Sequence, residues 1–323
     1  MTRFTFLVAA FALFNAVGPL VGRASTIPPR WRIRVGVLAL AGMLVAAVSL
    51  LAAVLLPEVL VGSSIGQIWR MCTAAFRAIS SHPLGRWPSI VAGALLAVIL
   101  GRFVWTLFVG ARATRRSRVR ACEPRWLLSG GEHVYVLPLS HPEAYSVGGF
   151  RGQVVITRGL LEALDDDERR AVLLHEEGHL KSRHHACLAV ARAARAALAP
   201  LPSVRPAIER LEQAIEEAAD EYAAAKLGSA ATVASGLSKA ALAGLRSPVG
   251  ALSIASGQDV PARVRRLLAT PQAPGWVPLA CLLGLGLLVG VIAATQVIAG
   301  FAVVAAAHHL LGVGAVVTCP LAR

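Results

Sequence analysis

Acidic residues are nearly absent from both ends of this sequence of 323 residues. Of its 18 Asp and Glu residues, only Glu58 lies outside residues 123–259. Charged residues make up only 15% of the chain and hydrophobic residues 56%, which argues against an ordinary soluble domain of this size. The net charge of +14 comes mostly from basic residues that flank apolar segments, as arginines at a membrane surface do. We therefore expect a lipid bilayer as partner and no direct contact with nucleic acid.

Four apolar stretches predict transmembrane helices. We expect them at about residues 4–22, 35–56, 89–110 and 276–298. A signal peptide is the alternative for the first stretch, but the arginine-rich residues 23–34 that follow suit a retained helix and a cytoplasmic loop. Residues 57–88 would then form an outer loop, in which residues 65–79 allow an amphipathic interfacial helix.

The order of these stretches predicts a topology in the cell membrane. The N-terminus would lie outside, and residues 111–275 would form a cytoplasmic domain that begins with a cluster of arginines. Residues 276–323 would supply the fourth helix and a short outer tail, and whether residues 301–317 also cross the membrane stays open. The five cysteines form no CxxC pair and indicate neither a disulfide framework nor a thiolate zinc site. Cys72 and Cys319 would share the outer side, and their pairing also stays open.

One basic residue, Arg102, interrupts the third apolar stretch. An ionisable residue inside a membrane is a functional candidate by default. Because Arg102 lies about eight residues from the inner end of the stretch, we favour the simpler interpretation that its side chain reaches the cytoplasmic interface.

The cytoplasmic domain, residues 111–275, begins with a β pattern and continues with helices. Alternating apolar residues predict strands, and longer periodic stretches predict helices. Asp165 and Glu168 have the spacing of a capping box at the start of the first helix, and Pro200 would end that helix near residue 198. The strands are expected at residues 133–139, 144–147 and 153–157, and the helices at residues 165–198, 206–227 and 230–243.

The first of these helices carries an HExxH motif within residues 171–185, AVLLHEEGHLKSRHH. Residues four apart lie on one helix face, so His175 and His179 can bind the same ion. Glu176 would then lie beside a water molecule on that ion and act as the general base. Two solvated histidines are the alternative, which the apolar flanks of the motif explain poorly. The motif therefore predicts a catalytic Zn²⁺.

A catalytic zinc needs a third protein ligand, and two candidates compete. His185 fits an extended motif, but Ser182 replaces the glycine of that motif, and a continuous helix would turn His185 about 280° away from His175. We prefer Glu216 from the next helix, with Asp220 one turn later as hydrogen-bond acceptor for a ligand histidine. Glu212 and Glu217 are the remaining candidates on that helix.

A short β region, an HExxH helix and a later ExxAD helix resemble the integral-membrane gluzincin metallopeptidases. The layout of four spans, with the peptidase between the third and fourth, resembles the BlaR/MecR antirepressor peptidases. The resemblance implies zinc bound by His175, His179 and Glu216, with Glu176 as base. The fold class that we expect is mainly α, with multi-pass transmembrane helices and an inserted α+β zincin-like (gluzincin) domain.

This resemblance predicts a membrane-embedded zinc endopeptidase in signal transduction. Its substrate would be a cytoplasmic regulatory protein, such as a winged-helix transcriptional repressor, and residues 144–147 or 153–157 would bind the substrate as an added strand. A quality-control protease of the HtpX kind is the alternative enzyme, and a non-proteolytic membrane signalling or scaffold protein with a structural zinc is the alternative of another class. The sequence leaves the oligomeric state open.

Overall fold

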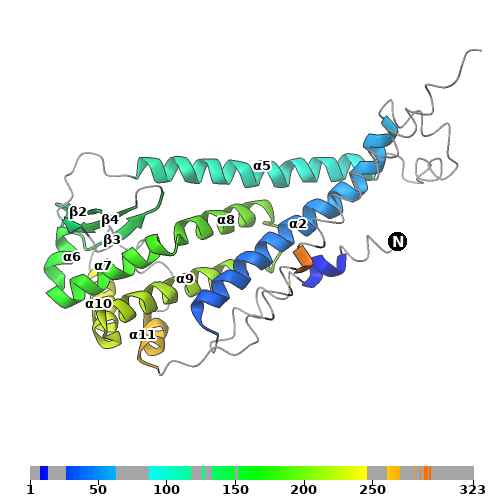
Figure 1. The fold of residues 1–323 in the computed structure, drawn as a ribbon. Helices are drawn as coiled ribbons and strands as arrows, with labels where there is room; N and C mark the ends of the chain where they lie inside the picture. Colours follow the sequence, from blue (N-terminus) through cyan, green and yellow to red (C-terminus); the bar gives the residue numbers. More distant parts are fainter. Residues whose placement is uncertain are drawn as a thin grey trace, which may run out of the picture.

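The protein is mainly helical, with one small sheet (Figure 1). The computed structural model describes residues 8–13, 27–62, 87–117, 126–127, 133–149, 152–245 and 260–269, with isolated positions between residues 280 and 291. Two long helices come first, the strands follow, and six further helices complete the described part. These elements are α2 (Pro29–Gly62), α5 (Trp87–Arg116), β1 (Trp126–Leu127), β2 (His133–Leu137), β3 (Ala144–Val147), β4 (Gln153–Thr157), α6 (Arg158–Ala163), α7 (Asp166–Lys181), α8 (His184–Ala197), α9 (Val204–Leu227), α10 (Ala230–Leu245) and α11 (Val260–Leu268).

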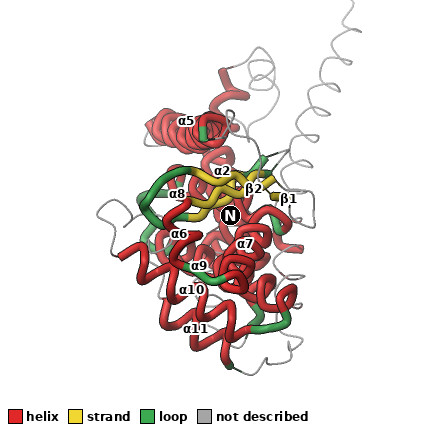
Figure 2. Tube along the Cα trace, turned by 90° about the vertical axis from the view of Figure 1, so that its left-hand side faces the viewer, coloured by secondary structure: helices red, strands yellow, loops and turns green. Residues whose placement is uncertain are grey.

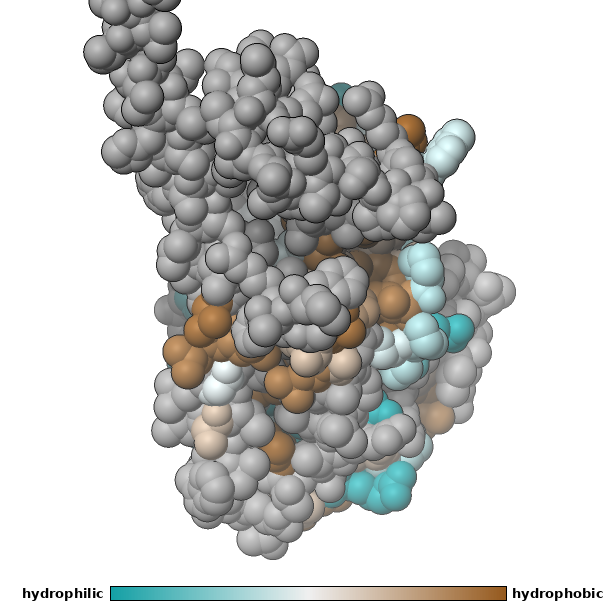
Figure 3. Space-filling model, turned by 90° about the vertical axis from the view of Figure 1, so that its right-hand side faces the viewer, coloured by the Kyte–Doolittle hydropathy of each residue, from teal (hydrophilic) through white to brown (hydrophobic). Residues whose placement is uncertain are grey.

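The helices α2 and α5 are both long and apolar enough to cross a membrane. Their apolar stretches, Pro29–Ala52 and Ile90–Arg116, overlap most of the second and third predicted spans, and 39% of the first and 6% of the second lie buried inside the molecule. In the view of Figure 3, side chains of the described residues are mainly brown across the middle of the molecule and teal lower down. The first and fourth predicted spans fall largely outside the described residues, as do residues 65–79, residues 301–317, Cys72 and Cys319.

Both long helices extend beyond the predicted limits. The outer loop was expected to begin at residue 57, but α2 continues through Pro57 to Gly62. The apolar residues on both sides of Pro57 prolong the helix, and a proline removes one backbone hydrogen bond without ending it here. At its C-terminal end, α5 continues six residues past Gly110 into the arginine cluster, because arginine is a good helix former.

The strands form a four-stranded sheet in the order β1-β2-β4-β3. The parallel pair β2 and β4 lies at the centre, and β3 pairs antiparallel with β4 at one edge. The three predicted strands are confirmed, although β2 ends two residues early at Leu137, and β1 was not predicted. Figure 2 shows the sheet as a thin layer, with α5 on one side and α7, α9 and α10 on the other.

The predicted capping box at the start of α7 is confirmed, but the predicted long helix is wrong. The Asp165 side chain accepts from the Glu168 amide, and the Glu168 side chain accepts from the Asp165 amide. Instead of running to residue 198, α7 ends at Lys181 and α8 begins at His184. Arg183 between them has a φ of 52°, a left-handed conformation that ends a helix and turns the chain. This break changes the direction of both His184 and His185.

Two apolar cores hold the helices in place. One buries Leu40 and Met43 of α2 against Ile208 and Ile215 of α9, with small residues of α8 filling the space between. The other joins the sheet to α6, α7 and α10, and Ile156 lies fully buried within it. A smaller cluster packs α7 directly on α9. The two helices that carry the predicted zinc ligands are therefore held against each other by this third cluster, and each is anchored by one of the two larger cores.

Polar contacts attach both long helices to the helices that follow the sheet. Arg32, in the first turn of α2, is buried and forms an ion pair with Glu217 of α9. The Arg102 Nε atom of α5 donates to the carbonyl oxygen of Ala196, 2.6 Å away in the last turn of α8. A cation at a helix C-terminus is favourable because carbonyl oxygens there lack helical partners. The structure thus gives Arg102 a contact with α8, and its expected reach toward the membrane interface stays a prediction.

Candidate metal centre

Three predicted ligand side chains meet between α7 and α9. His175 and His179 lie one turn apart on α7, and their Nε2 atoms are 3.1 Å from each other. The Glu216 carboxylate approaches from α9, with oxygen atoms 3.5 Å from the Nε2 atom of His175 and 3.6 Å from that of His179. Among the described residues, these three side chains form the group that could hold a metal ion.

The spacing of these atoms fits a zinc ion. Tetrahedral zinc with bonds of about 2.0–2.1 Å separates neighbouring ligand atoms by about 3.4 Å. The three observed separations, from 3.1 to 3.6 Å, lie around that value. Two imidazoles and one carboxylate are also ligand types that zinc accepts, and a catalytic zinc uses three protein ligands. The donor set and its dimensions therefore match the metal that the sequence predicts, while the ligand roles stay predictions.

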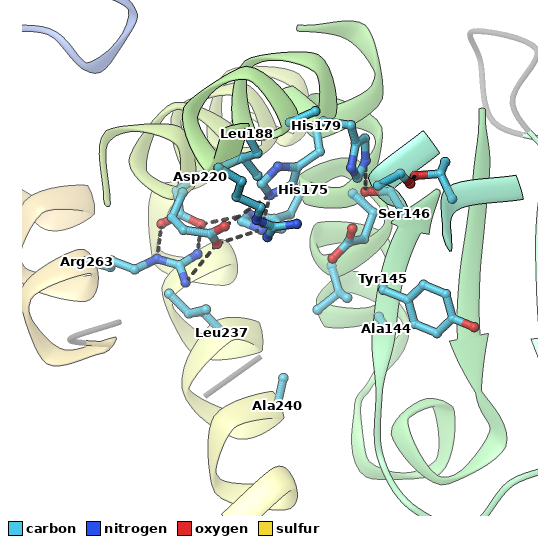
Figure 4. Close-up of a pocket in the computed structure, with 18 of the residues that line it drawn as sticks. Ala144, Tyr145, Ser146, His175, His179, Leu188, Asp220, Leu237, Ala240 and Arg263 are labelled. Carbon is cyan, nitrogen blue, oxygen red and sulfur yellow. Dashed lines mark hydrogen bonds and ion pairs between the residues drawn. The ribbon is translucent and has the colours of Figure 1, made fainter. Parts of the chain in front are cut away.

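On the α9 side, carboxylates and a guanidinium surround His175 (Figure 4). The Nδ1 atom of His175 lies 2.9 Å from an oxygen of Asp220, which leaves Nε2 facing the other ligands. Arg263 of α11 holds Asp220 with two hydrogen bonds of 2.8 and 2.7 Å and lies 3.3 Å from Glu216. Arg263 and Asp220 are almost completely buried. Burial opposes a charge on His175, but the two carboxylates outweigh it and raise the pKa to about 10. This side of the centre therefore attracts positive charge.

On the α8 side, His179 has a neutral neighbour. Its Nδ1 atom lies 3.3 Å from the Nδ1 atom of His184, a side chain that is 2% exposed. Burial, together with positive charge on His175, lowers the pKa of His179 to about 3. Burial also lowers the pKa of His184, to about 4. Both rings therefore favour the neutral form, in which an imidazole binds a metal, whereas His175 favours a proton that a bound metal would replace.

Glu176, the predicted base, lines a cavity of about 960 Å³ next to the metal centre. Burial raises its pKa, while positive charge on His175 and a hydrogen bond from Ser146 act in the opposite direction. A raised pKa suits a carboxylate that takes up a proton and then releases it. The Ser146 side chain, from β3, also hydrogen-bonds His185 at 3.1 Å. The cavity thus joins the HExxH helix to the edge strand of the sheet.

The other predicted ligand candidates are not part of the three-residue group. His185 bonds Ser146 and is not part of the three-residue group; the helix break, and not the continuous helix assumed from the sequence, directs it there. Glu217 faces α2 and α11, where it pairs with Arg32 and Arg266. Glu212 is also not part of the group.

Three further side chains belong to this centre and were not predicted: Arg263, His184 and Ser146. Arg263 lies in a run of arginines that looks like an exposed charge cluster, so its sequence context carries no sign of burial. His184 lies five residues after His179 and would face away from it, about 140° around, on a continuous helix. The pair of adjacent histidines, His184 and His185, was the one signal in the sequence that could have indicated His184. Its meaning becomes clear only with the break at Arg183, which turns His184 toward His179.

Comparison with known families matches residues 127–240 to the family described as Peptidase family M48. The matched segment runs from β1 into α10, so it includes His175, Glu176, His179, Glu216 and Asp220, and it ends before Arg263. This similarity supports a metallopeptidase domain for which zinc is the expected metal.

Curated relatives point the same way over short stretches. A protein named "Protease HtpX homolog" from Aquifex aeolicus is 42% identical over 52 residues, which is 16% of this chain and 17% of that protein. Its namesake from Aeropyrum pernix is 30% identical over 122 residues, 34% of this chain and 37% of that protein. The chain thus matches these relatives over much less than half of their length. No solved structure matches the chain. The names favour the HtpX-like alternative over the BlaR/MecR-like assignment, which neither match supports.

Proposed function

We propose that this protein is a multi-pass membrane zinc endopeptidase of the HtpX kind, with its peptidase domain on the cytoplasmic side. One observation carries the proposal: three zinc-type ligands and a buried glutamate meet at the wall of a large cavity. Structural zinc sites are closed by four protein ligands, whereas catalytic sites keep one position open. Three ligands facing a cavity support the catalytic kind over the scaffold alternative.

The residues around the cavity divide the work of peptide hydrolysis. Zinc, when bound, supplies a Lewis acid that polarises the scissile carbonyl and acidifies a water molecule. Glu176 accepts the proton of the attacking water and passes it to the nitrogen of the leaving amine. Asp220 orients His175, and Arg263 holds both Asp220 and Glu216 in place. These roles require no movement of α7 relative to α9, which are packed on each other.

The substrate is proposed to bind as an extended strand along β3. Of the two strands expected to take this role, β4 is paired on both sides, with β2 and with β3. In contrast, β3 lies at the edge of the sheet, and its residues Ala144, Tyr145 and Ser146 line the cavity. Main-chain hydrogen bonds to an edge strand bind peptides of many sequences, which suits an enzyme with varied substrates.

The cavity also favours membrane proteins as substrates. Trp105 and Val109 of α5 line the same cavity as Glu176, and α5 is one of the two helices apolar enough to cross a membrane. On the other wall, Val233 and Leu237 of α10 provide further apolar surface. The cavity wall therefore offers apolar side chains from a candidate membrane helix to an apolar substrate segment, which supports quality control of membrane proteins.

A single substitution tests the proposed chemistry. We expect Glu176→Gln to bind one zinc per chain but to lose casein cleavage by the purified full-length protein in detergent. Glu162→Gln, an exposed residue of α6, is the matched control and should keep both zinc and activity. Cleavage by Glu176→Gln at the wild-type rate, or a wild-type protein without zinc, would overturn the proposal.

A second experiment separates quality control from signalling. The BlaR/MecR-like layout favours cleavage of a winged-helix repressor, so we would compare protein N-termini in cells that carry wild type or Glu176→Gln. New N-termini next to apolar segments of several membrane proteins support the HtpX-like role. A single new N-terminus within a cytoplasmic repressor supports the signalling role and contradicts membrane quality control.

A further inference from the structure

His179 and His184 face each other through their Nδ1 atoms, 3.3 Å apart. Two imidazoles form a hydrogen bond in this way only if one Nδ1 carries a proton and the other offers its lone pair. The geometry alone allows either direction. Because His184 is 2% exposed, water does not compete for this contact.

The metal centre decides the direction of the hydrogen bond. The Nε2 atom of His179 points at the Nε2 atom of His175 and at Glu216. If His184 donated, the neutral His179 ring would carry its proton on Nε2, directed at the metal position. If His179 donates, its Nε2 lone pair is free to bind zinc. The second arrangement is the one compatible with the ligand group.

We propose that His184 is the positioning residue for His179: its Nδ1 atom accepts the proton of His179 and fixes the zinc-binding tautomer and ring orientation. The proposal rests on the proposed zinc site. It assigns to a neutral imidazole the part that Asp220 has for His175, and that carboxylates, carbonyl groups or waters usually have. The break at Arg183 makes the contact possible, since it turns the start of α8 back toward α7.

The ring of His184 is also held in place. It stands nearly perpendicular to the ring of His179, with an interplanar angle of 82° and centroids 5.1 Å apart. Its neighbour His185 is fixed separately by Ser146 of β3. Each of the two adjacent histidines therefore has its own partner, one on the metal side and one at the edge strand. This difference supplies a matched control.

The proposal is tested by measuring the zinc affinity of the full-length protein in detergent, in competition with a coloured chelator. His184→Leu removes the acceptor at similar volume and should weaken zinc binding roughly 10–100-fold, the usual effect of losing an outer partner of a ligand. His184→Asn keeps an acceptor oxygen near the position of Nδ1 and should restore most of the affinity. His185→Leu, which leaves the His179 contact intact, should bind zinc as wild type does.

Thermal unfolding with excess chelator separates positioning from simple stability. The three variants should unfold within a few degrees of wild type, since the proposed role acts on the bound metal. If His184→Leu is already unfolded, the zinc affinities of His184→Asn and His185→Leu are compared instead. His184→Leu that binds zinc as tightly as wild type overturns this inference alone, as does His184→Asn that binds as weakly as His184→Leu. Wild type without zinc overturns both the inference and the proposed function.

Discussion

The two histidines of the motif are one helical turn apart, yet their surroundings differ in kind. His175 faces α9 and α11, where Asp220, Glu216 and Arg263 form a buried charged network. His179 faces α8, where its partner is the neutral ring of His184. The charged side is built from residues far apart in sequence, and the neutral side depends on a break in the chain at Arg183, four residues after His179. The two histidines of one motif are thus held by two different sets of contacts, and each set can be tested separately by mutation.

The charged side should be the more sensitive of the two. Removing one partner from a buried charge pair leaves the other charge uncompensated, which costs more than the pair itself contributes. The neutral side loses at most a hydrogen bond and the orientation of a ring. The predictions below move from the ligand on the charged side outward, and then to the break on the neutral side.

Replacement of Glu216 should have the largest effect. Loss of a residue that only orients a metal ligand lowers metal affinity by up to roughly 100-fold. We expect Glu216→Ala to lower the zinc affinity by more than this, because it removes a predicted ligand itself. Metal content after dialysis and peptidase activity should fall together. Glu212→Ala lies one turn earlier on the same helix and is the matched control. Equal loss of zinc in Glu212→Ala would contradict the placement of the third ligand.

Replacement of Arg263 should come next. Arg263→Leu leaves Asp220 buried without its cation, and we expect the free energy of unfolding to fall by about 3–5 kcal/mol. Arg263→Lys keeps the charge but loses the two parallel hydrogen bonds, so its loss should be intermediate. Arg265→Leu, exposed on the same helix, should change stability little. Denaturant unfolding in detergent measures all three, and an unaffected Arg263→Leu would show that α11 does not support the centre.

Glu168, a carboxylate away from the predicted metal centre, should make the stability of the protein depend on pH. Burial acts to raise the pKa of Glu168, but Lys239, Ser235 and the Asp165 amide outweigh it and lower the pKa to about 2, against an ordinary value of 4.5. The stability from Glu168 is therefore present above about pH 4.5 and is lost as the pH falls toward 2.

We expect Glu168→Gln to be less stable than wild type by about 1 kcal/mol at neutral pH, because glutamine can keep the capping hydrogen bond but loses the charge that pairs with Lys239. The two proteins should converge near pH 2. Unfolding with excess chelator excludes zinc loss as the cause, and Glu162→Gln is the control. A constant difference across this pH range would show that the charge of Glu168 does not matter.

Arg183, at the break on the neutral side, should give the smallest effect. A side chain in the left-handed conformation is strained by about 1–2 kcal/mol, and glycine relieves the strain but makes the unfolded chain more flexible. We expect Arg183→Gly to raise stability by about 0.5 kcal/mol with unchanged zinc affinity. Gly228, which ends α9 with a φ of 76°, already uses glycine in this way. A less stable Arg183→Gly would indicate that the arginine side chain itself holds the turn.

Local patterns in the sequence were sufficient to predict much of this architecture. The strands are short runs of β-favouring residues with turn glycines between the last two, Asp165 and Glu168 have the spacing of a cap, and the ExxAD run places Glu216 and Asp220 on one face of α9. Each of these patterns depends on residues a few positions apart, where backbone periodicity alone fixes which side chains are neighbours. The same periodicity accounts for the approach of His175 to His179.

The remaining features depend on contacts that no short pattern contains. Arg263 binds Asp220, which lies 43 positions earlier in the sequence. The charged residues next to Arg263 in the sequence are those expected of an exposed helix. The break after Lys181 contains neither glycine nor proline, the residues that usually mark such a turn. Without that break the sequence directs both His184 and His185 away from the site. Tertiary packing, and not local preference, therefore decides the partner of His179.

The ion pair between Arg32 and Glu217 has a consequence for the order of events during synthesis. The two residues are 185 positions apart, so at about 5–20 residues per second Arg32 leaves the ribosome roughly 10–40 seconds before its partner exists. In the proposed topology, the free arginine first helps to retain its loop in the cytoplasm while α2 is inserted. Once α9 is made, the same charge is withdrawn from water and fastens the helix beside the predicted zinc ligand Glu216. One side chain then serves biogenesis early and the finished enzyme later.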